Sequence, residues 1–120
     1  MAWDPFGTIG HASPQLILAE GWGLRPELVA PLLDNLRRMV VLVPTEEFRL
    51  RQLSRMPRAS TFHHDVSDPE LAQRNRLERD RLVAADAVAS ARRLGIRVIE
   101  VDGSRDAEAV ADEVGDHYGL

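Results

Sequence analysis

Apolar residues gather in three short runs, separated by segments in which they recur at helical spacing. The runs cover residues 15–20, 39–43 and 96–101, and each is the length of a strand. A turn with two glycines, Gly21-Trp22-Gly23, closes the first run. The second run, MVVLV, is continuous, as in a strand that is covered on both faces. We therefore predict three strands.

The first predicted helix follows the first strand. Pro26 suits the opening position of a helix, where a missing N–H costs nothing. Pro31 lies inside the same segment and is expected to kink the helix or delay its start. The leucine-rich residues behind Pro26 form one apolar stripe: Leu28, Val29, Leu32, Leu33 and Leu36.

Three further helices are predicted from their start and stop signals. Thr45 caps a helix that runs to about Arg55, with two glutamates in its first turn. After a polar loop or flap (residues 56–67), the motif Ser-Asp-Pro-Glu at 67–70 opens a long helix that stops at Gly95. Its apolar face carries Leu77, Ala84, Val88 and Ala91. A last helix follows the turn at 102–104, with Ala107, Val110, Ala111 and Val114 on one face.

Alternating strands and helices indicate an α/β fold: a three-layer α/β/α arrangement around a short parallel sheet, spanning residues 15–120. Residues 1–14 are expected to be an irregular N-terminal arm. Ligands bind beyond the carboxyl ends of parallel strands. The segments that end or follow the strands, at 20–23, 44–46 and 102–104, should therefore share one rim.

Composition narrows the class of protein. A chain of 120 residues suits one domain, and its net charge of −4 gives no general attraction to nucleic acid or to an anionic membrane. The longest apolar run, 39–43, is much shorter than a membrane-spanning helix, and the N-terminus does not resemble a signal peptide. With no cysteine, disulfides are excluded, and we expect a cytoplasmic protein.

All basic residues are arginine, and lysine is absent. GC-rich coding bias would explain this without any function. Whatever the cause, any phosphate chemistry must depend on guanidinium groups and backbone N–H groups.

Four segments together resemble the carboxyl-terminal half of P-loop kinase-like proteins, the nucleoside- and nucleotide-kinase type of NTPase that includes AAA-family relatives. The segments are LILAEGWGLRPELVAPLL, VLVPTEEFR, DPELAQRNRLERDRL and IEVDGSRDAEAVADEV. The resemblance covers roughly residues 15–120 and depends on the order and spacing of these segments.

The resemblance implies roles for particular residues. Glu20 matches the acid that faces the phosphoryl acceptor or the magnesium shell. Arg76 and Arg79 match the arginines of the lid helix, with Arg74 and Arg81 as alternates. The turn near the adenine ring matches Asp102, Gly103 and Ser104. Mg²⁺ and ATP are implied on the same basis, in a phosphotransferase or ATPase.

The chain departs from that family at the phosphate-binding loop. The motif G-x-x-x-x-G-K-[ST] is absent, since there is no lysine and the pair Gly7 and Gly10 has the wrong spacing. We therefore expect a truncated or degenerate relative that is inactive alone and binds neither Mg²⁺ nor ATP tightly. Whether the chain is an enzyme stays open.

Each candidate residue also has a structural interpretation. Glu20 could be an exposed loop carboxylate or could cap the next helix, and Trp22 could cover the edge of the core. Arg76 and Arg79 could belong to a solvated helix face with surface ion pairs. The segment His63-His64-Asp65 could bind a metal, but adjacent histidines point apart, so no metal site is predicted.

Two other functions therefore stay open. One is a non-catalytic binding or regulatory protein that uses the same rim. The other is a metal-dependent hydrolase that uses Glu20 and the histidine pair.

The resemblance also predicts an assembly. Without the strand that normally lies beside it, the edge formed by Leu16, Ile17 and Leu18 is open and apolar, which invites pairing. We expect either direct pairing of 15–20 with 39–43 or a homodimer through that edge, and favour the homodimer.

Overall fold

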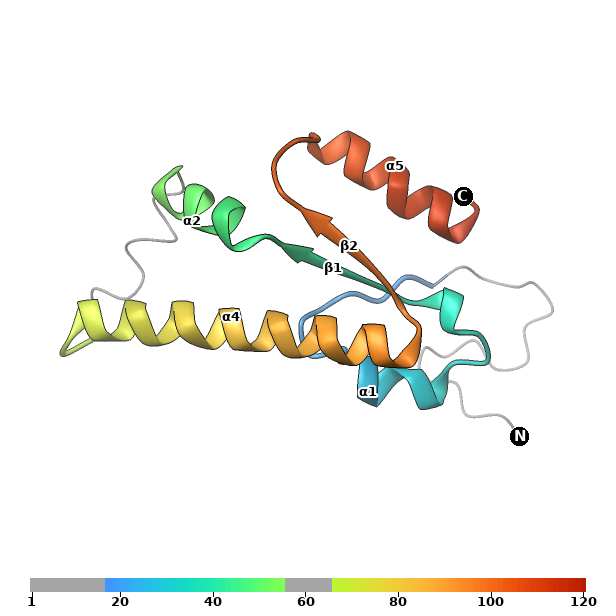
Figure 1. Cartoon of the computed structure of the whole chain (residues 1–120), viewed down its shortest axis with the longest axis horizontal. Coiled ribbons are helices and arrows are strands. Elements are labelled where there is room, and N and C mark those ends of the chain that lie inside the picture. The colour runs from blue at the N-terminus through green and yellow to red at the C-terminus, as the bar shows by residue number, and fades with distance from the viewer. Residues whose placement is uncertain (1–16, 56–65) are drawn as a thin grey trace.

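A computed structural model describes residues 17–55 and 66–120 (Figure 1). Along this part of the chain the elements follow in this order: α1 (Pro26–Val29), the 3₁₀ turns η1 (Ala30–Leu32) and η2 (Leu36–Arg38), β1 (Val40–Pro44), α2 (Glu46–Arg55), α4 (Pro69–Leu94), β2 (Arg97–Val101) and α5 (Ala107–Tyr118).

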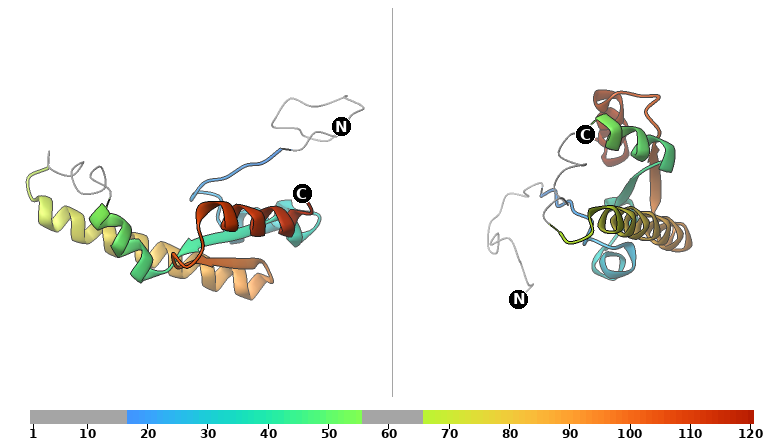
Figure 2. Two further views of the ribbon diagram at one scale, coloured as in Figure 1. Left: turned by 90° about the horizontal axis from the view of Figure 1, so that it is seen from above. Right: turned by 90° about the vertical axis from the view of Figure 1, so that its left-hand side faces the viewer.

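The two strands form a parallel pair, in register from Val40 opposite Arg97 to Pro44 opposite Val101. The connection between them contains α2 and α4. Helix α4 lies on one side of the pair and α5 on the other (Figures 1 and 2). The prediction of a mixed α/β fold with a short parallel sheet is confirmed at this level.

The prediction of a strand at 15–20 is wrong over its described part. Residues 17–20 are irregular, and Leu18 is 77% exposed. A strand needs a hydrogen-bonded neighbour, and among the described residues none pairs with this segment. Both views of Figure 2 place it on the β1 side of the sheet. The described sheet therefore has two strands, and residues 17–20 do not form the direct pairing with 39–43 that was one of the two expected alternatives. Residues 1–14 lie outside the described residues.

The core lies between the sheet and the carboxyl-terminal half of α4. Val41, Ala91 and Ile96 are buried together, and Val43 and Val98 pack against them. Of the predicted apolar face of α4, Ala91 is fully buried, whereas Leu77, Ala84 and Val88 are only half-buried. On the opposite side of the sheet, Ile99 of β2 and Val110 of α5 are buried.

The helix predicted behind Pro26 is shorter than expected. It ends at Val29, and η1 continues it through Pro31. Proline has no N–H to give to the preceding turn, which explains the break. The predicted leucine stripe is also wrong, since Leu28 and Leu32 are exposed.

The other helix signals are confirmed. The Thr45 hydroxyl accepts the Phe48 N–H at 3.3 Å, and Asp68 caps α4 by accepting the Leu71 N–H at 3.1 Å. Helix α4 ends at Gly95, whose φ is 80°, in the left-handed region that favours glycine. Of the described helices, none combines the length and the apolarity that crossing a membrane requires.

Candidate functional site

The two strands end side by side, at Pro44 and Val101. The Thr45 N–H donates to the Val101 carbonyl at 2.9 Å, so the start of α2 is fixed to the end of β2. This is the edge of a parallel sheet at which ligands bind.

The turn after β2 is held by its own side chains. The Asp102 carboxylate accepts the Ser104 hydroxyl at 2.6 Å and the Ser104 N–H at 2.9 Å. The bond from the Ser104 hydroxyl is the main reason that the pKa of Asp102 lies below its ordinary value, with the Ser104 N–H second. Asp102 therefore has a structural partner.

Helix α2 packs directly on this turn. Gly103 has a φ of +87°, and a Cβ added there would lie 2.8 Å from the Phe48 ring. Arg51 donates to the Asp102 carbonyl at 2.9 Å. Two of the three predicted rim segments, 44–46 and 102–104, are thus brought together.

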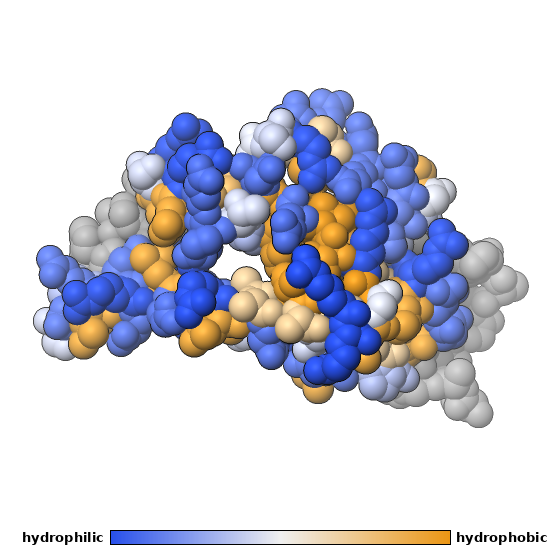
Figure 3. Space-filling view, viewed as in Figure 1, coloured by the Kyte–Doolittle hydropathy of each residue, from blue (hydrophilic) through white to orange (hydrophobic). Residues whose placement is uncertain are grey.

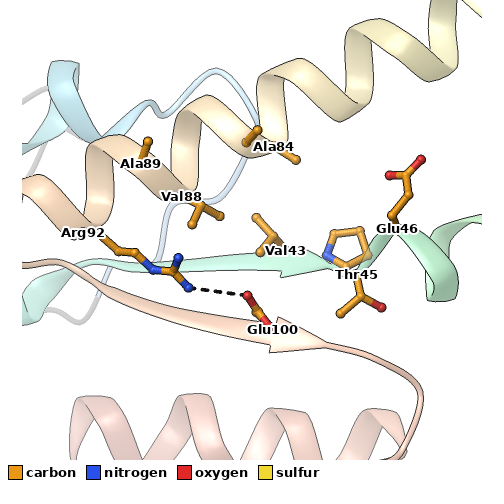
Figure 4. Close-up of a pocket in the computed structure, with 10 residues that line it drawn as sticks. Val43, Thr45, Glu46, Ala84, Val88, Ala89, Arg92 and Glu100 are labelled. Carbon is orange, nitrogen blue, oxygen red and sulfur yellow. Dashed lines mark ion pairs between the residues drawn. The ribbon is translucent and has the colours of Figure 1, made fainter.

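An open cleft of about 370 Å³ lies between the end of β1 and the middle of α4 (Figure 4). Its wall on the helix side is made of small apolar side chains. Arg92 and Glu100 face each other across the strand side at 3.5 Å, and Glu46 lies beside Thr45 at the start of α2. The lining residues are Val43, Pro44, Thr45, Glu46, Ala84, Ala85, Val88, Ala89, Arg92 and Glu100. In the space-filling view the molecule is hollowed between α2 and α4 (Figure 3).

Three arginines surround one carboxylate next to this cleft. Asp80 lies 2.9 Å from the guanidinium of Arg79 and 3.9 Å from those of Arg76 and Arg49. We call these four residues the Asp80 cluster. Arg49 also binds Glu46 at 2.6 Å and donates to the Leu77 carbonyl at 3.0 Å, which ties α2 to α4. Glu46 therefore joins the same network as a second carboxylate.

The predicted arginines differ in their surroundings. The Arg76 side chain is 23% exposed and that of Arg79 is 69% exposed. Neither lines the cleft, but both are linked to Glu46 at its wall through Asp80 and Arg49. The alternate Arg81 binds Glu78 at 2.5 Å. That bond is the main reason that the pKa of Glu78 is lowered.

Glu20 is exposed and has no ion pair or hydrogen bond within the described part of the chain. It belongs to the irregular segment, so the structure does not join it to the other two rim segments. Trp22 is 87% exposed and does not cover the core. His63, His64 and Asp65 lie outside the described residues.

Sequence reasoning missed Arg49, Arg92 and Glu100. The i, i+4 spacing of Arg76 and Asp80 was readable on one helix. The approach of Arg49 depends on how α2 folds back over α4, and no local pattern carries it. The pair of Arg92 and Glu100 depends likewise on how α4 packs on β2.

Comparisons of this chain with protein-family models, with curated proteins and with solved structures found no match.

Proposed function

We propose that this chain is a P-loop kinase-like domain, related to phosphotransferases and ATPases, that is inactive alone because it lacks the phosphate-binding loop. The observation that supports this most is the Asp80 cluster, which lies beyond the carboxyl ends of two parallel strands. The guanidinium groups of Arg49, Arg76 and Arg79 at that edge suit a phosphoryl group.

The chemistry needs little covalent participation from the protein. Phosphoryl transfer depends on positioning and on neutralising charge at the phosphoryl oxygens. Arg49, Arg76 and Arg79 come from two helices, so an oxyanion between them would be held from two directions. A phosphate would compete with Asp80 for these guanidinium groups.

The described residues do not by themselves fit Mg²⁺ and ATP. Among them, no group of three histidine, aspartate or glutamate side chains lies close enough to hold a metal ion. The Asp102 carboxylate, expected near the adenine ring, is taken by Ser104. What the Asp80 cluster offers is a site for a phosphoryl anion.

Thermal melting in added phosphate tests the proposal. Phosphate should raise the Tm of the wild-type chain, and the Arg76→Ala/Arg79→Ala variant should lose most of that rise. Arg38→Ala is a matched control, because its side chain is 69% exposed, as that of Arg79 is, and pairs with Asp34 away from the cluster. If phosphate raised the Tm of the double variant and of the wild type equally, Arg76 and Arg79 would belong to a solvent-exposed helix face and not to a phosphate site.

A second candidate is a non-catalytic binding or regulatory protein that uses the same rim. The observation in its favour is that Asp80 and Glu46 already neutralise much of the cluster. Asp80→Asn separates the two functions. A phosphoryl site should then show a stronger phosphate response, because its competitor is gone, whereas a structural ion-pair network should only lose stability.

A further inference from the structure

The two outer edges of the sheet differ in their protection. On β2, the outward carbonyl of Glu100 accepts a bond from Arg105 at 3.1 Å, and the strand carries the charged side chains of Arg97 and Glu100. Charges and caps of this kind discourage pairing with another strand. On β1, residues 40–43 carry no charge.

The bond from the Thr45 N–H to the Val101 carbonyl fixes the direction of the β1 backbone. Because successive residues of a strand point their backbone groups to opposite sides, Val41 and Val43 face β2, and Val40 and Leu42 face outward. Within the described residues, no hydrogen bond covers these outward groups. The Leu42 side chain is also half exposed.

The segment around β1 has opposite charges at its two ends, so two copies that run antiparallel are complementary in charge. It reads RRMVVLVPTEE from residue 37 to residue 47, with Leu42 at its centre. Arg37 lies in η2 and Glu47 in the first turn of α2, just outside the two ends of the strand. Antiparallel pairing of two copies about Leu42 would bring the Arg37 end of each next to the Glu47 end of the other. The side chains of Arg37 and Glu47 have no ion pair within the described part of the chain. Charge complementarity therefore favours a second copy of this chain at this edge.

We infer that β1 is an interaction surface for a second copy of this chain, paired antiparallel about Leu42 across a two-fold axis. The two Leu42 residues exchange both backbone bonds, and the Val40 N–H of each copy donates to the partner copy's Pro44 carbonyl. Pro44 has no N–H, which closes the ladder at that end. The two strand pairs become one four-stranded sheet.

The irregular segment 17–24 passes on this side of β1 (Figure 2), but its described backbone bond is local, from the Leu24 N–H to the Gly21 carbonyl. It must lie clear of the edge when the second copy binds. The inference does not depend on the proposed function. A strand that completed a nucleotide site at the same edge would exclude the second copy.

Cross-linking tests the register, because the native chain has no cysteine. Residues in a hydrogen-bonded antiparallel pair have Cα atoms about 5.5 Å apart, within the range of a disulfide. Leu42→Cys should therefore form a disulfide-linked dimer on mild oxidation at micromolar concentration. Leu50→Cys, equally exposed on α2, should not.

Sedimentation of charge variants tests the complementarity. Arg37→Glu and Glu47→Arg should each weaken the dimer by about tenfold or more, since like charges then oppose each other at both ends. The double variant should recover most of that loss. Leu42→Lys should also weaken it, with Leu50→Lys as the control.

A weak specific dimer should form at about 100 µM. A wild-type chain that stays monomeric at that concentration would overturn the inference. So would a dimer that all these variants leave unchanged. A monomer in which Leu42→Cys/Ile17→Cys forms an internal disulfide would show that segment 17–24 itself covers the edge, which also overturns it.

Discussion

Phe48 and Gly103 meet where α2 crosses the turn after β2, and this contact decides what can stand at position 103. The positive φ and the ring at 2.8 Å from any added Cβ both favour glycine. Asp102 and Ser104 beside it shape the same turn. The turn at 102–104 therefore has a structural role: it packs against α2 and so fixes the position of Arg49 on that helix.

Gly103→Ala should lower the free energy of unfolding by about 1–3 kcal/mol, because the new side chain needs a strained backbone and must displace Phe48. Chemical denaturation measures the change. Gly115→Ala is the control: it lies within α5 with open space around it, so alanine there should stabilise by up to about 1 kcal/mol. Equal effects at both positions would contradict the close contact at Phe48.

Ser104→Ala should make the chain less sensitive to acid. The Ser104 hydroxyl lowers the pKa of Asp102 in the folded state, so the unfolded chain binds more protons between the two values. The stabilisation is therefore complete above about pH 4, the ordinary pKa of aspartate, and is lost as the pH falls below it. Denaturation at several pH values should show the wild type and the variant converging in acid.

Ser54→Ala is the control for this pH series. The Ser54 hydroxyl donates to the Arg51 carbonyl at 2.7 Å, so its removal should change stability equally at every pH. A difference between Ser104→Ala and the wild type that stays constant down to pH 3, about one unit below the ordinary pKa of aspartate, would show that the Ser104 hydroxyl does not lower the pKa of Asp102.

At the scale of elements, strong local signals were sufficient for β1, α2, α4, β2 and α5. These signals depend only on residues close in the sequence: a continuous apolar run, a proline at the first helical position and a glycine at a helix end. The run at 15–20 had the composition of a strand, but composition supplies no hydrogen-bond partner. The leucines behind Pro26 had helical spacing, yet Pro31 interrupted the helix that would have aligned them.

The candidate site divides in the same way. Arg76 and Arg79 could be selected from their place on the predicted long helix. Their contact with Arg49 around Asp80 could not be predicted, because it depends on how α2 and α4 pack against each other. Tertiary contacts of this kind leave no periodic trace in a sequence.

Ala91→Leu should destabilise the joint between α4 and the sheet by about 1–3 kcal/mol, because the site is filled by Val41 and Ile96. Ala89→Leu, two residues earlier and exposed at the cleft, should cost much less. Urea midpoints compare the two. If both variants unfolded at the wild-type midpoint, the core would not lie where α4 meets β1.

At the scale of the whole molecule, a two-stranded parallel sheet is a small framework, and its outer edges become important. Sheets of so few strands are marginal unless helices cover them or further strands join them. Helices α4 and α5 cover the two faces. Within the described part of the chain the outer edge of β1 is unpaired, and it is there that we propose a second copy extends the sheet; a strand that completes a nucleotide site would use the same edge.

Calorimetric titration with Mg·ATP should show no binding tighter than about 1 mM, a free energy near −4 kcal/mol. The reason is the missing lysine and glycine loop, which normally supply the phosphate contacts. A micromolar dissociation constant would mean that this chain alone builds a complete nucleotide site, against the proposal.

The guanidinium groups of the Asp80 cluster can be observed directly by NMR of the arginine Nε–H signals during titration with inorganic pyrophosphate. We expect Arg49, Arg76 and Arg79 to shift together and to saturate at one common dissociation constant, while Arg38 stays in place. In Asp80→Asn the same shifts should saturate at a lower concentration, because the competing carboxylate is gone. Shifts spread evenly over all arginines, or none at the cluster, would contradict a phosphoryl site at this edge of the sheet.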